Sequence, residues 1–175
     1  RLAELYVVVT DSTGRPVSGL GRNDFQVFED GVEQTLDAAV DSQEAPLTIG
    51  LAIDTSASMF AKLAAVGKAG QALLAGLRAG RDQTFLVGFG PEPELVEPLA
   101  GDLIRVSRSL LDLEARGRTP LWGSIGFSLG ELERARGRRA LVLFSDGADH
   151  DGSRAFNQTL RRARALAAPI YLVVM

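Results

Sequence analysis

The sequence predicts an α/β protein: a doubly wound, mainly parallel sheet with helices on both faces, a Rossmann-like arrangement, preceded by a small N-terminal all-β element. From Leu47 onward, short apolar runs alternate with longer segments whose apolar residues recur at helical spacing. That alternation is typical of βαβ units. The apolar runs contain few polar residues, as expected of strands that are buried on both faces. Before residue 46 the pattern indicates strands and turns alone.

Length, charge and composition restrict the class of protein. The 175 residues suffice for one full domain and a small extra element, and 46% hydrophobic with 23% charged residues is ordinary for a globular protein. A net charge of −3 argues against nucleic acid as a partner. No apolar run approaches the length of about 18 residues that a membrane span needs. The absence of cysteine excludes disulfides and thiolate metal sites.

Residues 1–45 are expected to form a β extension. Apolar, β-branched runs predict strands at residues 5–10, 25–28 and 32–40. Asp30 and Gly31 form an Asp-Gly pair, which is a strong hairpin signal between the last two strands. So few strands form a thin layer that needs another surface to cover it. Residues 42–46 are polar and end in proline, so we expect a linker there.

Residues 46–175 carry the α/β pattern and are expected to form the main domain. Strands are predicted at residues 47–53, 85–89, 95–99, 140–144 and 170–175. Helices are predicted at residues 59–79, 103–113, 122–135 and 153–167. Pro98 suits an edge position for the third of these strands, and the last strand is expected to be buried.

Oxygen-bearing side chains follow two of the buried strands. The motif Asp54-Thr55-Ser56-Ala57-Ser58 comes directly after the 47–53 strand, and Ser145-Asp146-Gly147 directly after the 140–144 strand. Ligands bind at the carboxyl edge of open α/β sheets, where both segments are expected to lie. Thr119, in a loop before a helix, can join them if its loop also lies at that edge. Carboxylates and hydroxyls are hard oxygen ligands, which suit a divalent cation such as Mg²⁺.

This set of residues resembles the metal-ion-dependent adhesion site of the von Willebrand factor type A (VWA) domain. The family pattern is Asp-x-Ser-x-Ser, a distant Thr, and a distant Asp in a Ser-Asp-Gly turn. Its positions are filled here by Asp54, Ser56, Ser58, Thr119 and Asp146. The resemblance covers residues 47–175, and we expect the VWA domain to be truncated at its C-terminal end. Residues 1–45 resemble the β segment before this domain in a group of exported bacterial proteins, so we expect an exported protein: periplasmic, cell-surface or secreted.

The resemblance implies a metal site that recognises proteins without catalysis. Ser56 and Ser58 would coordinate the ion directly, and Thr119 would join or leave its shell with the conformation of the domain. Asp54 and Asp146 would hold bound waters. The expected ion is Mg²⁺, with Mn²⁺ or Ca²⁺ as alternatives. With few direct carboxylates the ion stays short of negative charge, so an Asp or Glu of a partner protein can complete its shell.

Residues around the motif leave smaller alternatives open. Arg118 stands where the family often has glycine, and Asp149 follows Asp146 closely, so both are candidates for a rim that contacts the ligand. A solvated polar turn is the simpler interpretation of Asp149-His150-Asp151. Trp122 either faces a ligand or, more simply, packs in the core.

Two other functions compete with adhesion. In one, the metal only braces the fold or an intramolecular contact. In the other, the site belongs to a Mg²⁺-dependent phosphoryl-transfer enzyme, which would want a second carboxylate where Ser56 stands. The sequence contains no phosphate loop, dinucleotide fingerprint or nucleophile elbow, so we predict a module that is not an enzyme. Without any metal, Ser56 or Ser58 would simply cap the following helix, and Asp54 would favour its dipole.

Overall fold

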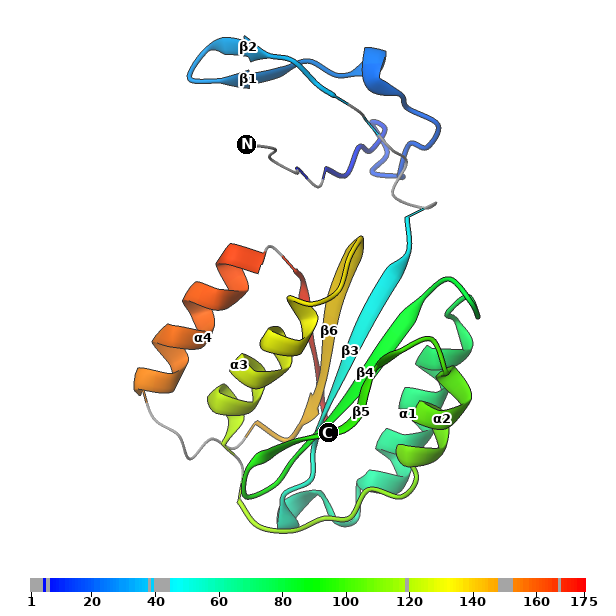
Figure 1. Ribbon diagram of the computed structural model, residues 1–175, viewed down its shortest axis with the longest axis vertical. Helices are drawn as coiled ribbons and strands as arrows, with labels where there is room; N and C mark the ends of the chain where they lie inside the picture. The colour runs from blue at the N-terminus through cyan, green and yellow to red at the C-terminus, as the bar shows by residue number, and fades with distance from the viewer. Residues whose placement is uncertain are drawn as a thin grey trace. The chain divides into compact units, whose positions relative to one another are not determined.

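A computed structural model describes residues 5, 7–37, 39, 45–118, 120–147, 153–166 and 168–175 (Figure 1). The chain divides into two compact units, Arg1–Ala45 and Pro46–Met175, which are considered separately below. None of the described helices is long and apolar enough to cross a membrane.

The N-terminal unit contains a short antiparallel hairpin of β1 (Val27–Glu29) and β2 (Val32–Gln34). Asp30 and Gly31 both have positive φ, 50° and 80°, as a two-residue hairpin turn requires. The predicted Asp-Gly hairpin is therefore confirmed, although its strands are shorter than expected. The predicted strand at residues 5–10 is wrong for the residues that the structure describes there, which form only an isolated bridge from Thr10 to Pro16.

The second unit is built on a mainly parallel sheet with the strand order β5-β4-β3-β6-β7. Three parallel strands form its centre: β3 (Leu47–Asp54), β4 (Gln83–Phe89) and β6 (Arg138–Ser145). β5 (Pro93–Ala100) pairs with β4 in the antiparallel sense at one edge, which is where Pro98 was expected. β7 (Ile170–Val174) lies at the other edge, parallel to β6.

Helices cover both faces of this sheet, as the alternation of strand and helix predicts (Figure 1). One apolar cluster joins α1 (Leu63–Ala75) and α2 (Leu103–Ser109) to one face, and a second joins α3 (Leu121–Leu132) and α4 (Ser153–Leu166) to the other. β3 contributes to both clusters because its side chains alternate. Ile49, Leu51 and Ile53 belong to the first cluster, and Ala52 to the second.

The last strand differs from its prediction. Residues 170–175 were expected to form a buried strand, but every residue of β7 is exposed, Val174 by 70%. In the described part of the chain β7 has a strand, β6, on one side only. An apolar run of this length marks a strand equally well at the centre or at the edge of a sheet, so the pattern could not distinguish the two.

Candidate metal site at the carboxyl edge of the sheet

Two loops of the predicted site leave neighbouring strands at the same edge of the sheet. Asp54 is the last residue of β3, and Ser145 is the last residue of β6. The strands are parallel, and Ile53 is paired with Phe144, so Asp54 and Ser145 are level with each other. The motif that follows β3 and the Ser145-Asp146-Gly147 turn therefore begin side by side, as the sequence predicts.

Asp54 is completely buried and ties these two loops together. Its Oδ1 accepts a hydrogen bond of 2.9 Å from the backbone N–H of Ser56, and its Oδ2 accepts one of 2.7 Å from the Ser145 hydroxyl. The Ser145 Oγ in turn accepts a 3.0 Å hydrogen bond from the Gly147 N–H. The carboxylate is thus held in one orientation by its own loop and by the loop after β6.

The two motif serines present their hydroxyls next to each other. Ser56 Oγ and Ser58 Oγ are 3.1 Å apart, with Ser56 buried and Ser58 exposed. Mg²⁺ binds oxygen at 2.0–2.1 Å in an octahedron, so two adjacent ligands lie about 3 Å apart. The hydroxyl pair therefore has the spacing of two neighbouring ligands of one ion. This donor set fits the metal that the sequence predicts.

The alternative that these serines cap the following helix is wrong. A short 3-10 turn, Ala57–Met59, comes first, and α1 begins only at Leu63 with Lys62 at its N-cap position. Ser56 has the N-cap position of the 3-10 turn, but its side chain makes no capping hydrogen bond. The predicted helix start at residue 59 is also wrong. The backbone N–H of Ala57 instead donates to Gly117 O (3.2 Å), so the motif remains a loop at the sheet edge.

Asp146 is paired with a lysine that the sequence analysis did not single out. Lys62 Nζ lies 3.3 Å from Asp146 Oδ2 and donates a 3.2 Å hydrogen bond to the Met175 backbone oxygen. Lys62 lies four residues after Ser58, and that proximity to the motif was the only available signal. Within the described residues, no three His, Cys, Asp or Glu side chains form a metal cluster. A site here therefore depends on hydroxyls and a few carboxylates.

Comparison with known proteins identifies the family. A family model described as the von Willebrand factor type A domain matches residues 49–148. The chain belongs to this family. The matched segment includes all but the first two residues of β3, the Asp54 motif and the Ser145-Asp146-Gly147 turn. A search of curated proteins found no match.

Solved structures share the fold at low sequence identity. One is the vWF domain of the type V pilus tip protein Mfa5 from Porphyromonas gingivalis (20% identity, TM-score 0.55), covering 60% of this chain and 39% of that one. A second is BatB from Bacteroides thetaiotaomicron (20% identity, TM-score 0.60), covering 73% of this chain and 66% of that one. A third is an aerotolerance-related membrane protein from Bacteroides fragilis (18% identity, TM-score 0.62), covering 73% of this chain and 67% of that one. The chain spans only 20% of a structure of three N-terminal Mfa5 domains.

The remaining residues predicted for the site of this VWA domain are only partly placed. Thr119 and Asp149 lie outside the described residues, as do His150 and Asp151. The chain just before Thr119 does run beside the motif, because the Arg116 N–H donates a 2.6 Å hydrogen bond to Thr55 O. Arg118 is exposed.

Gly117 lets the chain before Thr119 approach the connection between β4 and β5 closely. Its φ is +76°, and a Cβ there would lie 2.5 Å from the Pro91 ring. Any other residue here would be strained by the positive φ and by the contact of its Cβ with the Pro91 ring. The loop that leads to Thr119 therefore depends on glycine at this position.

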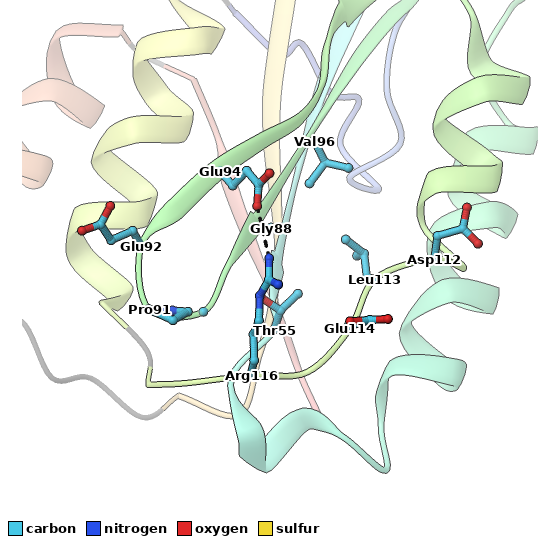
Figure 2. A pocket seen from close by; sticks show the side chains of 11 residues that line it. Thr55, Gly88, Pro91, Glu92, Glu94, Val96, Asp112, Leu113, Glu114 and Arg116 are labelled. Atoms are coloured by element: carbon cyan, nitrogen blue, oxygen red, sulfur yellow. Dashed lines mark ion pairs between the residues drawn. The ribbon is translucent and has the colours of Figure 1, made fainter.

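A cavity that the sequence does not predict lies beside the motif. It has a volume of about 210 Å³, and Thr55 lines it together with residues from β4, β5 and the segment after α2 (Figure 2). Four carboxylates line it, Glu92, Glu94, Asp112 and Glu114, against the single guanidinium of Arg116. Arg116 Nη2 and Glu94 Oε2 are 3.6 Å apart, and both side chains are exposed, so this ion pair is weak.

Trp122 is half-buried and packs against the second apolar cluster. Its ring meets Phe156 of α4 edge-on, with 4.7 Å between the ring centroids. Its backbone oxygen accepts a 2.8 Å hydrogen bond from the Thr159 hydroxyl. Trp122 therefore joins α3 to α4, in agreement with the simpler of its two predicted roles.

Proposed function

We propose that this VWA domain is a metal-dependent protein-interaction module that binds an acidic residue of its partner. Ser56 and Ser58 would hold Mg²⁺ directly, with Thr119 as a further ligand, and Asp54 and Asp146 would hold its waters. The observation that carries the proposal is the pair of serine hydroxyls 3.1 Å apart beside the buried Asp54 carboxylate. Asp54 also links that pair to the Asp146 turn through Ser145.

The partner chemistry follows from the charges of the donor set. Hydroxyls are neutral, so the bound ion would keep most of its positive charge and attract a carboxylate. The donors sit at the open edge of the sheet, where Ser58 is exposed and accessible to another protein. Charge complementarity of this kind favours an Asp or Glu over its amide.

The relatives agree with a role in contacts outside the cell. Besides the Mfa5 domain, the pilus adhesin SpaC from Lactobacillus rhamnosus GG shares the fold, with 19% identity and a TM-score of 0.53. By analogy, we infer an adhesive role for this chain at the cell surface or after export. Nothing in this role calls for catalysis.

A peptide array tests the proposed recognition directly. We expect the protein to bind a subset of immobilised acidic peptides in the presence of Mg²⁺. Replacement of each Asp or Glu of these peptides by its amide should abolish that binding. Addition of EDTA should abolish the same signals. Asp37→Ala is a suitable control, because this exposed carboxylate lies in the N-terminal unit.

Two results of the array would contradict the proposal. Equal binding to the amide peptides would show that no carboxylate is recognised. Binding that survives EDTA would show that the metal is not needed at the interface. A metal that changes thermal stability but no peptide signal would favour the alternative in which it only braces the fold.

A further inference from the structure

A fixed positive charge lies within the candidate metal site. Lys62 lies four residues after Ser58, at the N-cap position of α1. Its ammonium group is 3.3 Å from Asp146 Oδ2 and 3.2 Å from the Met175 backbone oxygen. Asp146 is one of the two carboxylates that the proposed function assigns to the ion. Lys62 therefore contacts the donor set without belonging to it.

The ion pair is sheltered enough for its charges to matter. The side chains of Lys62 and Asp146 are 34% and 16% exposed, so solvent and salt screen them less than a fully exposed pair. A divalent ion near Asp146 would be repelled by an ammonium group at this distance. Lys62 and the ion therefore compete for the same carboxylate.

We propose that Lys62 is a built-in counter-cation that holds Asp146 in the metal-free protein and lowers the affinity of the site for Mg²⁺. This inference rests on the proposed metal site. The lysine side chain is long and its rotamers interconvert readily, so its head group can leave Asp146 when the ion binds. The metal-free loop thereby keeps its shape, and the ion remains exchangeable.

Charge-neutral variants of Lys62 separate this role from a structural one. We would titrate Mg²⁺ by calorimetry into the chelator-treated 175-residue chain as wild type, Lys62→Met and Lys62→Gln, and record the Tm of each metal-free protein. Removal of the ammonium should tighten the Kd for Mg²⁺ about three- to tenfold. The same variants should lower the metal-free Tm, because the ion pair between Lys62 and Asp146 is lost.

The chain offers two matched controls for this experiment. Lys68 is the other of its two lysines and is exposed on the same helix, so Lys68→Met should change neither quantity. Lys62→Arg keeps the charge and should leave the Kd near the wild-type value. If Lys62 had only a structural role, its replacement by Met or Gln would lower the Tm without tightening the Kd for Mg²⁺.

Each outcome decides a separate question. Unchanged or weaker Mg²⁺ binding by the neutral Lys62 variants, with normal binding by the wild type, would overturn this inference and leave the proposed function standing. Absence of binding by the wild type itself would overturn both. If Lys62→Met does not fold, Lys62→Gln gives the result, because its amide can still donate a hydrogen bond to Asp146.

Discussion

Asp82 is a single buried carboxylate that connects separate parts of this domain. It lies just before β4, where its two oxygens accept hydrogen bonds from the Leu47 N–H (2.9 Å) and from the backbone and guanidinium of Arg78. The Arg78 hydrogen bonds hold the pKa of Asp82 well below its usual value. Asp82 thus fixes the end of the α1 connection to the first residue of β3.

Asp82→Asn should destabilise the domain in a pH-dependent way. Because the pKa of Asp82 is lower in the folded state, its stabilisation is fully present above the unfolded pKa of about 3.9 and is lost as the pH falls below it. We expect urea unfolding at pH 7 to show a loss of about 2 kcal/mol, and a smaller loss at pH 3. Asp37→Asn is the control, and a loss that is equal at both pH values would contradict this role.

At the candidate metal site, the sequence could predict the position of the candidate donors better than that of their neighbours. Asp54, Ser56 and Ser58 form one short motif directly after an apolar run, so spacing alone locates them at the sheet edge. Lys62 pairs with Asp146 across 84 positions of sequence, and no local pattern carries such a contact. Of the predicted ligands, Asp54 and Asp146 are joined through Ser145, while Thr119 remains a prediction because it lies outside the described residues.

Individual elements follow their predicted order, but their ends depend on tertiary contacts. The Ala- and Leu-rich stretch predicts a helix at residues 59–79, yet α1 runs only from Leu63 to Ala75. At its start, hydrogen bonds from the Thr55 and Ala57 N–H groups to Phe89 O and Gly117 O hold the motif out of the helix. At its end, the Arg78–Asp82 contact turns the chain toward β4. Helix propensity predicts neither end of α1, because both ends depend on these contacts.

Packing across the central strands depends on a glycine in β3. Gly50 is paired with Phe85 and Leu141, and a Cβ at Gly50 would overlap the fully buried Phe85 ring. The ring therefore occupies the space that a side chain at position 50 would need. A run of apolar residues in the sequence does not reveal this pairing, since it depends on the register of two separate strands.

Gly50→Ala should lower the free energy of unfolding by about 1–3 kcal/mol, because overpacking forces the Phe85 ring to move. Urea unfolding of Gly50→Ala, Phe85→Leu and the double variant should show that Phe85→Leu relieves part of the loss. Gly101→Ala is the matched control, since the nearest atom to its added Cβ is 3.8 Å away. Strict additivity of the two changes would contradict the proposed clash.

At the scale of the whole molecule, alternation of strands and helices was enough to predict the sheet, its two covered faces and the edge that carries the site. It was not enough for the N-terminal unit. Among the residues of that unit that the structure describes, the strands are limited to a hairpin of two three-residue strands, and Phe28 and Val32 remain exposed. Apolar, β-branched runs form stable strands only where another layer covers them. A sequence pattern does not show whether that layer is present.

The central claim, a metal ion at the Asp54 motif, also concerns the whole molecule. An ion that binds only the folded state stabilises it, by about 2.7 kcal/mol at a free concentration one hundred times the Kd. Binding should therefore appear both as heat and as a higher Tm. A site with neutral hydroxyls and few carboxylates should release the ion fully to a chelator.

Isothermal titration of Mg²⁺ into the chelator-treated 175-residue chain, with Asp54→Ala and the control Asp37→Ala alongside, tests this claim most directly. Saturable binding by the wild type and by Asp37→Ala, lost in Asp54→Ala, is the predicted result. Circular dichroism would establish that Asp54→Ala remains folded, since the carboxylate also holds Ser145. No binding by the wild type, or equal binding by a folded Asp54→Ala, would contradict the account.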